Sequence, residues 1–190
     1  MTEISFLPLG LDRARLTALM QARGLDGIFF SSPENVFYTT GYPCLPGSGN
    51  PIIYALRNQL PFFSYAGSDG RLILLAWAQA AMGIDYGVDD TRTWFTYPMA
   101  VDELTAFVQE TFKPGCTIGV DSICPFFLTQ IIQEHVQPVN LVIVDDLIQS
   151  LQLVKTEAEI ERIRQSTAII DKTVMELADC LHPGMTRLEL

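Results

Sequence analysis

Histidine is scarce in this sequence, and the groups of metal-binding residues that hydrolytic metal centres need are scarce as well. The 190 residues include two histidines, His135 and His182. Each stands at the end of a predicted helix, where a positively inclined side chain is favourable. A two-metal hydrolytic site needs several carboxylates, and usually a histidine, that converge on one point. The acidic pairs at 89–90 and 145–146 lie at predicted turns or strand ends, where capping accounts for them. We therefore predict no metal or other cofactor in this chain alone.

Other catalytic motifs are missing as well. The sequence contains no Gly-x-Ser-x-Gly elbow, no glycine-rich phosphate loop and no His-Glu-x-x-His pair. Its four cysteines, Cys44, Cys116, Cys124 and Cys180, include no Cys-x-x-Cys pair. Their spacing matches neither a zinc site nor a small disulfide scaffold. The pattern favours buried, reduced thiols of a cytoplasmic protein.

Basic residues are outnumbered, because 12 lysines and arginines face 22 acidic residues and the formal net charge is −10. Nucleic acid and anionic membrane surfaces are therefore not expected as partners, since both need a basic face. The longest stretch without a charge, residues 35–56, contains Pro43, Pro46 and Pro51 and so predicts a loop rather than a membrane helix. No export signal is recognisable, and we expect a cytoplasmic location.

Apolar residues, in contrast, are plentiful. Hydrophobic residues make up 48% of the sequence and charged residues 18%, a composition typical of a folded, soluble protein. The length suits one ordinary domain with an extension. We place the domain at residues 1–150 and the extension at residues 151–190.

The first elements are marked by their caps. Asp12 is placed to cap a helix that ends before Gly24, and residues 25–30 read as a strand. Ser32, followed by Pro33 at the first helical position, predicts a short helix that ends at Gly41. A proline- and glycine-rich loop is expected to follow.

The rest of the domain alternates between the two kinds of element. We predict strands at 52–56, 61–65 and 72–76, a helical turn at 78–82, a strand at 91–97, a helix at 101–112, a strand at 117–121, a helix at 125–136 and a strand at 139–144. The first three strands are expected to form an antiparallel meander. The later β–α alternation implies parallel pairing with helices over the sheet. The predicted fold class is therefore α/β, a layered α/β/α domain around a mixed sheet.

A long amphipathic helix is predicted after this domain. Thr156 and Glu159 form a capping box at its start, and Pro183 stops it near His182. Its apolar stripe recurs at spacings of three and four: Ile160, Ile163, Thr167, Ile170, Val174, Leu177 and Leu181. A second capping box, at 186–189, predicts that another helix starts there. We expect the chain to be the front part of a longer protein.

Two stretches resemble one known family. Residues 23–42 read Arg-Gly-Leu-Asp, an apolar strand, Ser-Pro-Glu-Asn and Thr-Gly-Tyr, as near the start of creatinase and prolidase-type proteins. Residues 151–164, continued by His-Pro-Gly-Met-Thr at 182–186, resemble the linker and turn that open the catalytic half of that family. Gln152 and His182 depart from the arginine and the basic residue usual at these positions, neither of which is catalytic.

The resemblance implies a creatinase/prolidase-like N-terminal domain with a ribonuclease H-like motif, followed by a linker helix and the start of a pita-bread catalytic domain. In Xaa-Pro dipeptidases and aminopeptidases P of this family, two Asp, one His and two Glu bind two divalent metals, usually manganese or cobalt. All of these ligands lie beyond the position that matches Leu190. The chain alone is therefore expected to be inactive.

Three functions remain open. The first is the N-terminal domain of a metal-dependent Xaa-Pro peptidase-like hydrolase, which supports a homodimer and narrows access of proline-containing peptides to the active site. The second is the same domain in a creatinase-like hydrolase, which acts on a C–N bond of a non-peptide without metals. The third is a free-standing interaction module. The loop from Tyr42 to Arg57 is expected to face the active site, with Tyr42 and Arg57 as candidate substrate-access residues.

Overall fold

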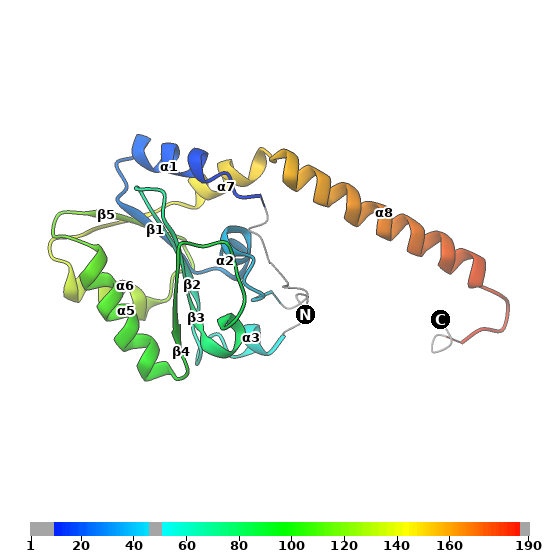
Figure 1. Cartoon of the computed structure of the whole chain (residues 1–190), viewed down its shortest axis with the longest axis horizontal. Coiled ribbons are helices and arrows are strands. Elements are labelled where there is room, and N and C mark those ends of the chain that lie inside the picture. The colour runs from blue at the N-terminus through cyan, green and yellow to red at the C-terminus, as the bar shows by residue number, and fades with distance from the viewer. Residues whose placement is uncertain (1–9, 46–50, 187–190) are drawn as a thin grey trace. The chain divides into compact units, whose positions relative to one another are not determined.

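The computed structural model describes residues 10–45 and 51–186 (Figure 1). By its internal contacts the chain divides into two compact units, residues 1–154 and residues 155–190. The boundary lies four residues after the one expected from the sequence. The first unit contains a six-stranded sheet with its helices, and the second contains one long helix.

The elements follow one another as helices and strands of modest length. They are α1 (Arg13–Ala22), β1 (Gly27–Phe30), α2 (Pro33–Thr40), α3 (Pro51–Ala55), β2 (Phe63–Gly67), β3 (Leu72–Trp77), α4 (Ala78–Ala81), β4 (Asp90–Trp94), α5 (Tyr97–Thr111), β5 (Thr117–Val120), α6 (Phe126–His135), β6 (Asn140–Ile143), α7 (Asp145–Leu153) and α8 (Glu157–Cys180). The strand order is β4-β3-β2-β1-β5-β6. β2 is antiparallel to β1 and β3, whereas the β3–β4, β1–β5 and β5–β6 pairs are parallel.

The sheet lies between two helical layers, as its alternating side chains require. Ile28 and Phe30 of β1 belong to a core shared with α1, α2 and α7. Phe29, between them, belongs to the opposite core, which is shared with α5 and α6. Successive residues of a strand point to opposite faces, so one short strand supplies both cores. Figure 1 shows α5 and α6 together on one side of the sheet. The predicted α/β/α layering around a mixed sheet is confirmed.

The predicted helix caps are present. The Asp12 side chain accepts a hydrogen bond from the backbone N–H of Arg15, and Ser32 Oγ accepts one from Asn35 N at 3.1 Å. Gly41 ends α2 with φ 74°, a left-handed conformation that costs a glycine little. These local hydrogen bonds fix where the chain enters and leaves α1 and α2.

Two predictions about the middle of the chain were wrong. Residues 52–56 are not a strand, because α3 begins at Pro51, whose fixed φ suits the first helical turn. Ile53 is buried whereas Ile52 is 57% exposed, so the segment lacks the continuous burial of the inner strands. The meander is therefore reduced to the β2–β3 hairpin, and β2 pairs on its other side with β1.

Helix α7 was not predicted and closes the first unit. Its acidic start at 145–146 suits the positive end of the helix dipole, and its buried residues are Leu147, Ile148 and Leu151. The Arg15 guanidinium donates hydrogen bonds to the carbonyl oxygens of Ser150 (2.8 Å), Leu151 (3.4 Å) and Val154 (3.3 Å). A side chain of α1 thus satisfies carbonyls that the end of α7 leaves open.

Helix α8 makes up most of the second unit. The capping box is present, because Thr156 Oγ1 accepts from Glu159 N while Glu159 Oε2 accepts from Thr156 N. The helix ends at Cys180, close to the predicted stop, and none of its 24 residues is buried. The second capping box extends to residue 189 and so lies outside the described residues.

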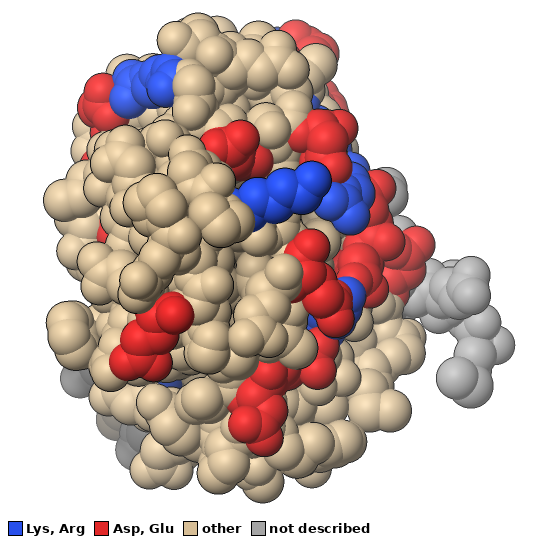
Figure 2. All heavy atoms as spheres, turned by 90° about the vertical axis from the view of Figure 1, so that its left-hand side faces the viewer, with Lys and Arg blue, Asp and Glu red and all other residues tan. Residues whose placement is uncertain are grey.

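Charged side chains are mostly acidic and dispersed. On the face drawn in Figure 2, acidic residues form several separate groups and basic residues are few. Arg92 of the edge strand β4 pairs with Asp90, Glu103 and Glu110 at 2.8–3.0 Å. These carboxylates raise the pKa of the Arg92 guanidinium, with the hydrogen bond to Asp90 as the largest cause. That face carries no continuous basic surface of the kind that phosphate backbones bind.

Candidate functional site

One edge of the sheet collects the carboxyl ends of β1, β3, β4, β5 and β6, because β2 alone among these strands runs the other way. After β1 the chain continues into α2 on one face, and after the neighbouring β5 it continues into α6 on the other face. Adjacent parallel strands whose connections leave to opposite faces open a crevice, and ligands of α/β sheets bind at such points. The candidate site lies there.

Asp121, the residue directly after β5, organises this edge. Its side chain is 98% buried, since the relative exposure is 2%. Oδ2 accepts hydrogen bonds from Ser31 N (2.9 Å), Ser32 N (2.8 Å) and Asn35 Nδ2 (3.3 Å), and Oδ1 accepts one from Ser31 Oγ. Four donors around one carboxylate compensate for its loss of water. Asp121 thereby ties the end of β5 to the β1–α2 turn.

Asn35 extends this network to α7. Its side-chain oxygen accepts a hydrogen bond from Gln152 Nε2 at 3.2 Å, while its Nδ2 donates to Asp121. Gln152 is one of the two positions that depart from the family pattern noted above. Here an uncharged amide bridges the end of α7 to the first turn of α2.

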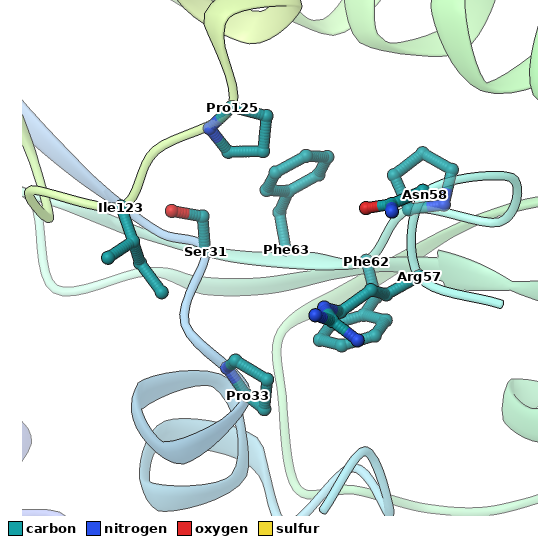
Figure 3. Close-up of a pocket in the computed structure, with 9 residues that line it drawn as sticks. Ser31, Pro33, Arg57, Asn58, Phe62, Phe63, Ile123 and Pro125 are labelled. Atoms are coloured by element: carbon teal, nitrogen blue, oxygen red, sulfur yellow. The ribbon is translucent and has the colours of Figure 1, made fainter. Parts of the chain in front are cut away.

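A hollow of about 130 Å³ lies beside this network (Figure 3). Its lining comes from the β1–α2 turn, the segment before β2 and the β5–α6 turn: Ser31, Pro33, Arg57, Asn58, Pro61, Phe62, Phe63, Ile123 and Pro125. The walls are mainly proline and aromatic side chains, with a hydroxyl, an amide and a guanidinium at the rim. Pockets for drug-sized ligands measure roughly 300–1,000 Å³. This hollow therefore suits one side chain rather than a whole peptide.

Arg57 is the charged group of the hollow. Its Nη1 donates to the carbonyl oxygen of Tyr54 at 3.0 Å, and its guanidinium carbon lies 4.4 Å from the centre of the Tyr54 ring. Both contacts hold an otherwise exposed side chain against α3, to which Tyr54 belongs. In Figure 3 its guanidinium points toward the side where Ser31 and Pro33 lie.

Tyr42, the other residue singled out from the sequence, lies elsewhere. Its side chain is fully buried in the core beneath α2, with ring centres 5.8 Å from those of Phe62 and Tyr86. Its hydroxyl makes no hydrogen bond of acceptable geometry within the described residues, although the backbone of Trp77 lies close enough to oppose the rise of its pKa. Burial raises the pKa of Tyr42, with the neighbouring Tyr86 adding to the effect. Of the two candidates, the structure therefore brings only Arg57 to the hollow.

The remaining candidate groups occupy structural positions. His135 ends α6 and contacts Gln109 through its ring nitrogen, and His182 follows α8. Burial raises the pKa of the Cys44 and Cys124 thiols to about 12, so both are protonated at neutral pH. Within residues 10–45 and 51–186 no group of three or more His, Cys, Asp or Glu is placed to hold a metal ion. In the same ranges no helix has the length and apolar character needed to cross a membrane.

The residues missed from the sequence share one pattern. Ser31 and Asp121 directly follow the parallel strands β1 and β5, and Ile123 lies two residues beyond Asp121 in the β5–α6 turn. The sequence signal that could have identified them is their position in a turn at the end of a predicted strand. Which strand ends meet was not readable, because it depends on the order of strands in the sheet.

Comparison with known proteins identifies this fold. The family model for the Creatinase/Prolidase N-terminal domain matches residues 13–165. The chain belongs to that family. The Xaa-Pro dipeptidase of Pyrococcus furiosus is 22% identical over 176 residues, which are 93% of this chain and 44% of the relative. The chain thus spans less than half the length of this curated relative.

Solved structures agree on the fold of the domain. A prolidase from Thermococcus sibiricus matches with a TM-score of 0.66 at 18% identity, covering 93% of this chain and 46% of that one. A dipeptidase from Pyrococcus horikoshii gives 0.63 at 17% identity, with the same coverages. The Creatinase/Prolidase N-terminal domain of a Streptococcus pyogenes X-Pro dipeptidase gives 0.52 at 15% identity, covering 73% of this chain and 99% of that one. The last match covers a solved N-terminal domain almost entirely.

Proposed function

We propose that this chain is the non-catalytic N-terminal domain, with its linker helix, of a metal-dependent Xaa-Pro peptidase-like hydrolase. The observation that carries the proposal is the family match over residues 13–165, together with relatives that are prolidases of about twice this length. The reaction itself would belong to the longer protein, whose further residues would hold two divalent metal ions, manganese or cobalt, that would supply Lewis-acid chemistry for peptide hydrolysis. A cytoplasmic location and a homodimer remain part of the proposal.

The carboxyl edge of the sheet is the surface that we propose to face the active site of the longer protein. The hollow beside Ser31 is too small for a dipeptide but large enough for one side chain, and its lining combines proline and phenylalanine rings with the polar side chains of Ser31, Arg57 and Asn58. Arg57 adds a cation at the rim, which is suited to a carboxylate of an entering peptide. Tyr42 takes no part in this contact, since its side chain is fully buried.

A creatinase-like parent is the second candidate, because the matching family includes creatinases as well as prolidases. The two candidates differ in what they require. A peptidase needs the Asp, Asp, His, Glu, Glu ligand set and divalent metal ions. A creatinase-like hydrolase acts on a non-peptide C–N bond without metal ions.

The test starts from the coding sequence beyond the codon for Leu190. If it encodes the five ligands in order, the complete protein should hydrolyse Xaa-Pro dipeptides with manganese or cobalt and lose this activity with a chelator. The 190-residue chain serves as the control and should stay at the blank rate with the same metals. Chelator-resistant hydrolysis of creatine by the complete protein would transfer the assignment to the second candidate. If the reading frame encodes no catalytic half, the free-standing interaction module becomes the assignment in place of either hydrolase.

A further inference from the structure

The hollow beside Ser31 is built by the first unit. The described residues that line it lie between positions 31 and 125, within residues 1–154. Its inner walls are held from behind, because the ring centre of Phe62 lies 5.8 Å from that of the buried Tyr42, and Pro61 O accepts a hydrogen bond from Trp94 Nε1 at 3.1 Å. The hollow is therefore preformed, and a ligand does not have to order its walls on binding.

The size of the hollow suits one ring. Its volume of about 130 Å³ is close to that of an engineered cavity of about 150 Å³ that binds benzene. Five rings contribute to the lining: Pro33, Pro61, Pro125, Phe62 and Phe63. A pyrrolidine ring that enters between them loses no side-chain rotamer freedom, whereas a long flexible side chain does. The hollow therefore favours a compact ring.

The polar side chains of the lining stand at its outer end. Phe62 and Phe63 are buried, whereas Arg57 and Asn58 are exposed. Figure 3 shows Arg57 and Asn58 on one side of the hollow and Ser31 toward the other. A ligand that matches both ends carries its apolar part inward and its charged group outward.

Arg57 has binding capacity that the other arginines of the first unit have already used. Arg15 donates to the carbonyl oxygens of α7, and four others form ion pairs with acidic side chains: Arg13, Arg23, Arg71 and Arg92. Within residues 10–45 and 51–186 no carboxylate forms an ion pair with Arg57, whose Nη1 donates to a carbonyl oxygen. In a chain of net charge −10, the rest of this guanidinium fork is suited to the carboxylate of a ligand.

Ser31 sets the direction of that carboxylate. Its hydroxyl donates its proton to Asp121 Oδ1, so the Ser31 oxygen offers lone pairs and no proton to the hollow. A carboxylate beside it would meet a second acceptor, with the buried Asp121 charge behind it. On the other side, the Arg57 guanidinium and the Asn58 amide are donors. The charged group of a ligand is therefore directed to Arg57.

We propose that the hollow binds the C-terminal proline of a peptide, with the pyrrolidine ring between the proline and phenylalanine walls and the free α-carboxylate on Arg57. The inference rests on the proposed function, because an Xaa-Pro dipeptide ends in this group. A C-terminal proline enters ring first and leaves its carboxylate at the exposed end, whereas an acidic side chain would enter carboxylate first, toward the buried phenylalanines. A residue that follows proline would take the carboxylate away from Arg57, so the site favours dipeptides over longer peptides.

The test titrates the 190-residue chain, without metal, with N-acetylproline and follows the backbone amide shifts by NMR. Saturable shifts should centre on Ser31, Phe62 and Ile123, with a dissociation constant of about 1–10 mM for so small a ligand. N-acetylproline amide has the same ring and no charge. It should bind about 10-fold more weakly, because the charge-assisted hydrogen bonds are lost.

Arg57→Ala separates the contribution of the carboxylate from that of the ring. It should weaken the binding of N-acetylproline by about 10-fold and that of the amide by less than about 2-fold, since both changes remove the same contact. The matched control is Arg71→Ala, which removes an exposed arginine from the β2–β3 turn at the opposite edge of the sheet. Its dissociation constant for N-acetylproline should stay within about 2-fold of the unchanged chain.

A second pair of variants changes charge with little change in size. Asn58→Asp places a carboxylate at the outer end of the hollow and should weaken the binding of N-acetylproline by about 5-fold or more. Gln59→Glu makes the same chemical change at the neighbouring exposed position, outside the lining. At about 0.15 M salt this control should stay within about 2-fold of the unchanged chain, because exposed charges are screened.

Three results would overturn the inference. The absence of saturable shifts with N-acetylproline would show that the chain has no such site. An equal effect of Arg57→Ala on N-acetylproline and on its amide would remove Arg57 as the partner of the carboxylate. Tighter binding of N-acetylglutamic acid α-amide, whose carboxylate is on its side chain, would assign the hollow to an acidic side chain. All of these results are independent of the peptidase assignment, which is measured on the complete protein with metal.

Discussion

Removing the Asp121 carboxylate tests whether a single buried acid holds the candidate site together. In Asp121→Ala the N–H of Ser32, which is buried, loses its acceptor and cannot regain water. The donors of Ser31 and Asn35 are only partly buried, so water replaces much of what they lose. An orphaned buried donor costs about 1–3 kcal/mol, and the lost charge-assisted bonds add to it, so we expect a total of about 3 kcal/mol. For a chain of this size that is a fall in Tm of roughly 6–12 °C.

Asp121→Asn provides a sharper comparison, because the geometry lets an amide keep every hydrogen bond. Its Oδ1 takes the place of the oxygen that accepts from Ser31 N, Ser32 N and Asn35 Nδ2. Its Nδ2 then faces Ser31 Oγ, and that hydroxyl reverses its role from donor to acceptor. Only the charge is lost, so we expect about 1 kcal/mol.

Urea unfolding followed by circular dichroism measures both variants. Asp145→Ala is the matched control, since Asp145 also accepts a bond from a backbone N–H, that of Ser122 at 2.9 Å, but at an exposed position. It should cost about 0.5 kcal/mol, including the loss of an acid from the first turn of α7. If Asp121→Ala costs no more than this control, or if Asp121→Asn is as damaging as Asp121→Ala, the reasoning about orphaned buried donors is refuted.

Three further predictions concern single side chains. Tyr42→Phe should leave the free energy of unfolding unchanged or raise it by up to about 1 kcal/mol, whereas Tyr86→Phe should lower it by about 1 kcal/mol in the same urea experiment, because its hydroxyl donates to Ala80 O at 2.7 Å. Burial raises the pKa of the Cys124 thiol from 9.0 to about 12, so the folded chain binds this proton more tightly than the unfolded chain does. The resulting contribution to the free energy of unfolding is complete below pH 9 and is lost as the pH rises toward 12. Urea midpoints measured from pH 9 upward should therefore fall less steeply in Cys124→Ala than in the unchanged chain. Arg57→Ala in the complete protein should raise KM or lower kcat without changing Tm, and unchanged kinetics with peptides of several lengths would remove Arg57 from the proposed access route.

Local signals in the sequence predicted much of the fold. Asp12, Ser32 and Thr156 were recognised as caps, because a cap depends on residues three positions apart. The segment at 52–56 was predicted wrongly because its local residue preferences point to a different element from the one it forms. Two isoleucines and a tyrosine favour a strand locally, and only the position of Pro51 and the burial of one face show the helix. Helix α7 was missed because its nine residues follow a strand without a break.

The candidate site was predicted less well than the fold. Arg57 was selected because it closes a long loop, and it lines the hollow, whereas Tyr42, in the same loop, lies in the core. Asp121 is 90 residues from Ser31 in the sequence, and no local pattern indicates that β5 lies beside β1. Contacts of that length depend on strand order, which local periodicity does not encode. The family resemblance supplied the domain type, and the arrangement of this edge came from the structure.

The hold of Arg15 on the last turn of α7 also decides where the first unit can be separated from the rest. A fragment that ends at Val154 keeps Leu151 in its core and retains all three carbonyls to which the guanidinium donates. A fragment that ends at Ser150 loses a buried leucine and two of the three acceptors. Helix α1 therefore supplies the side chain that holds the end of α7. The first unit can be transferred to another protein as a self-contained domain only if both of these helices are included.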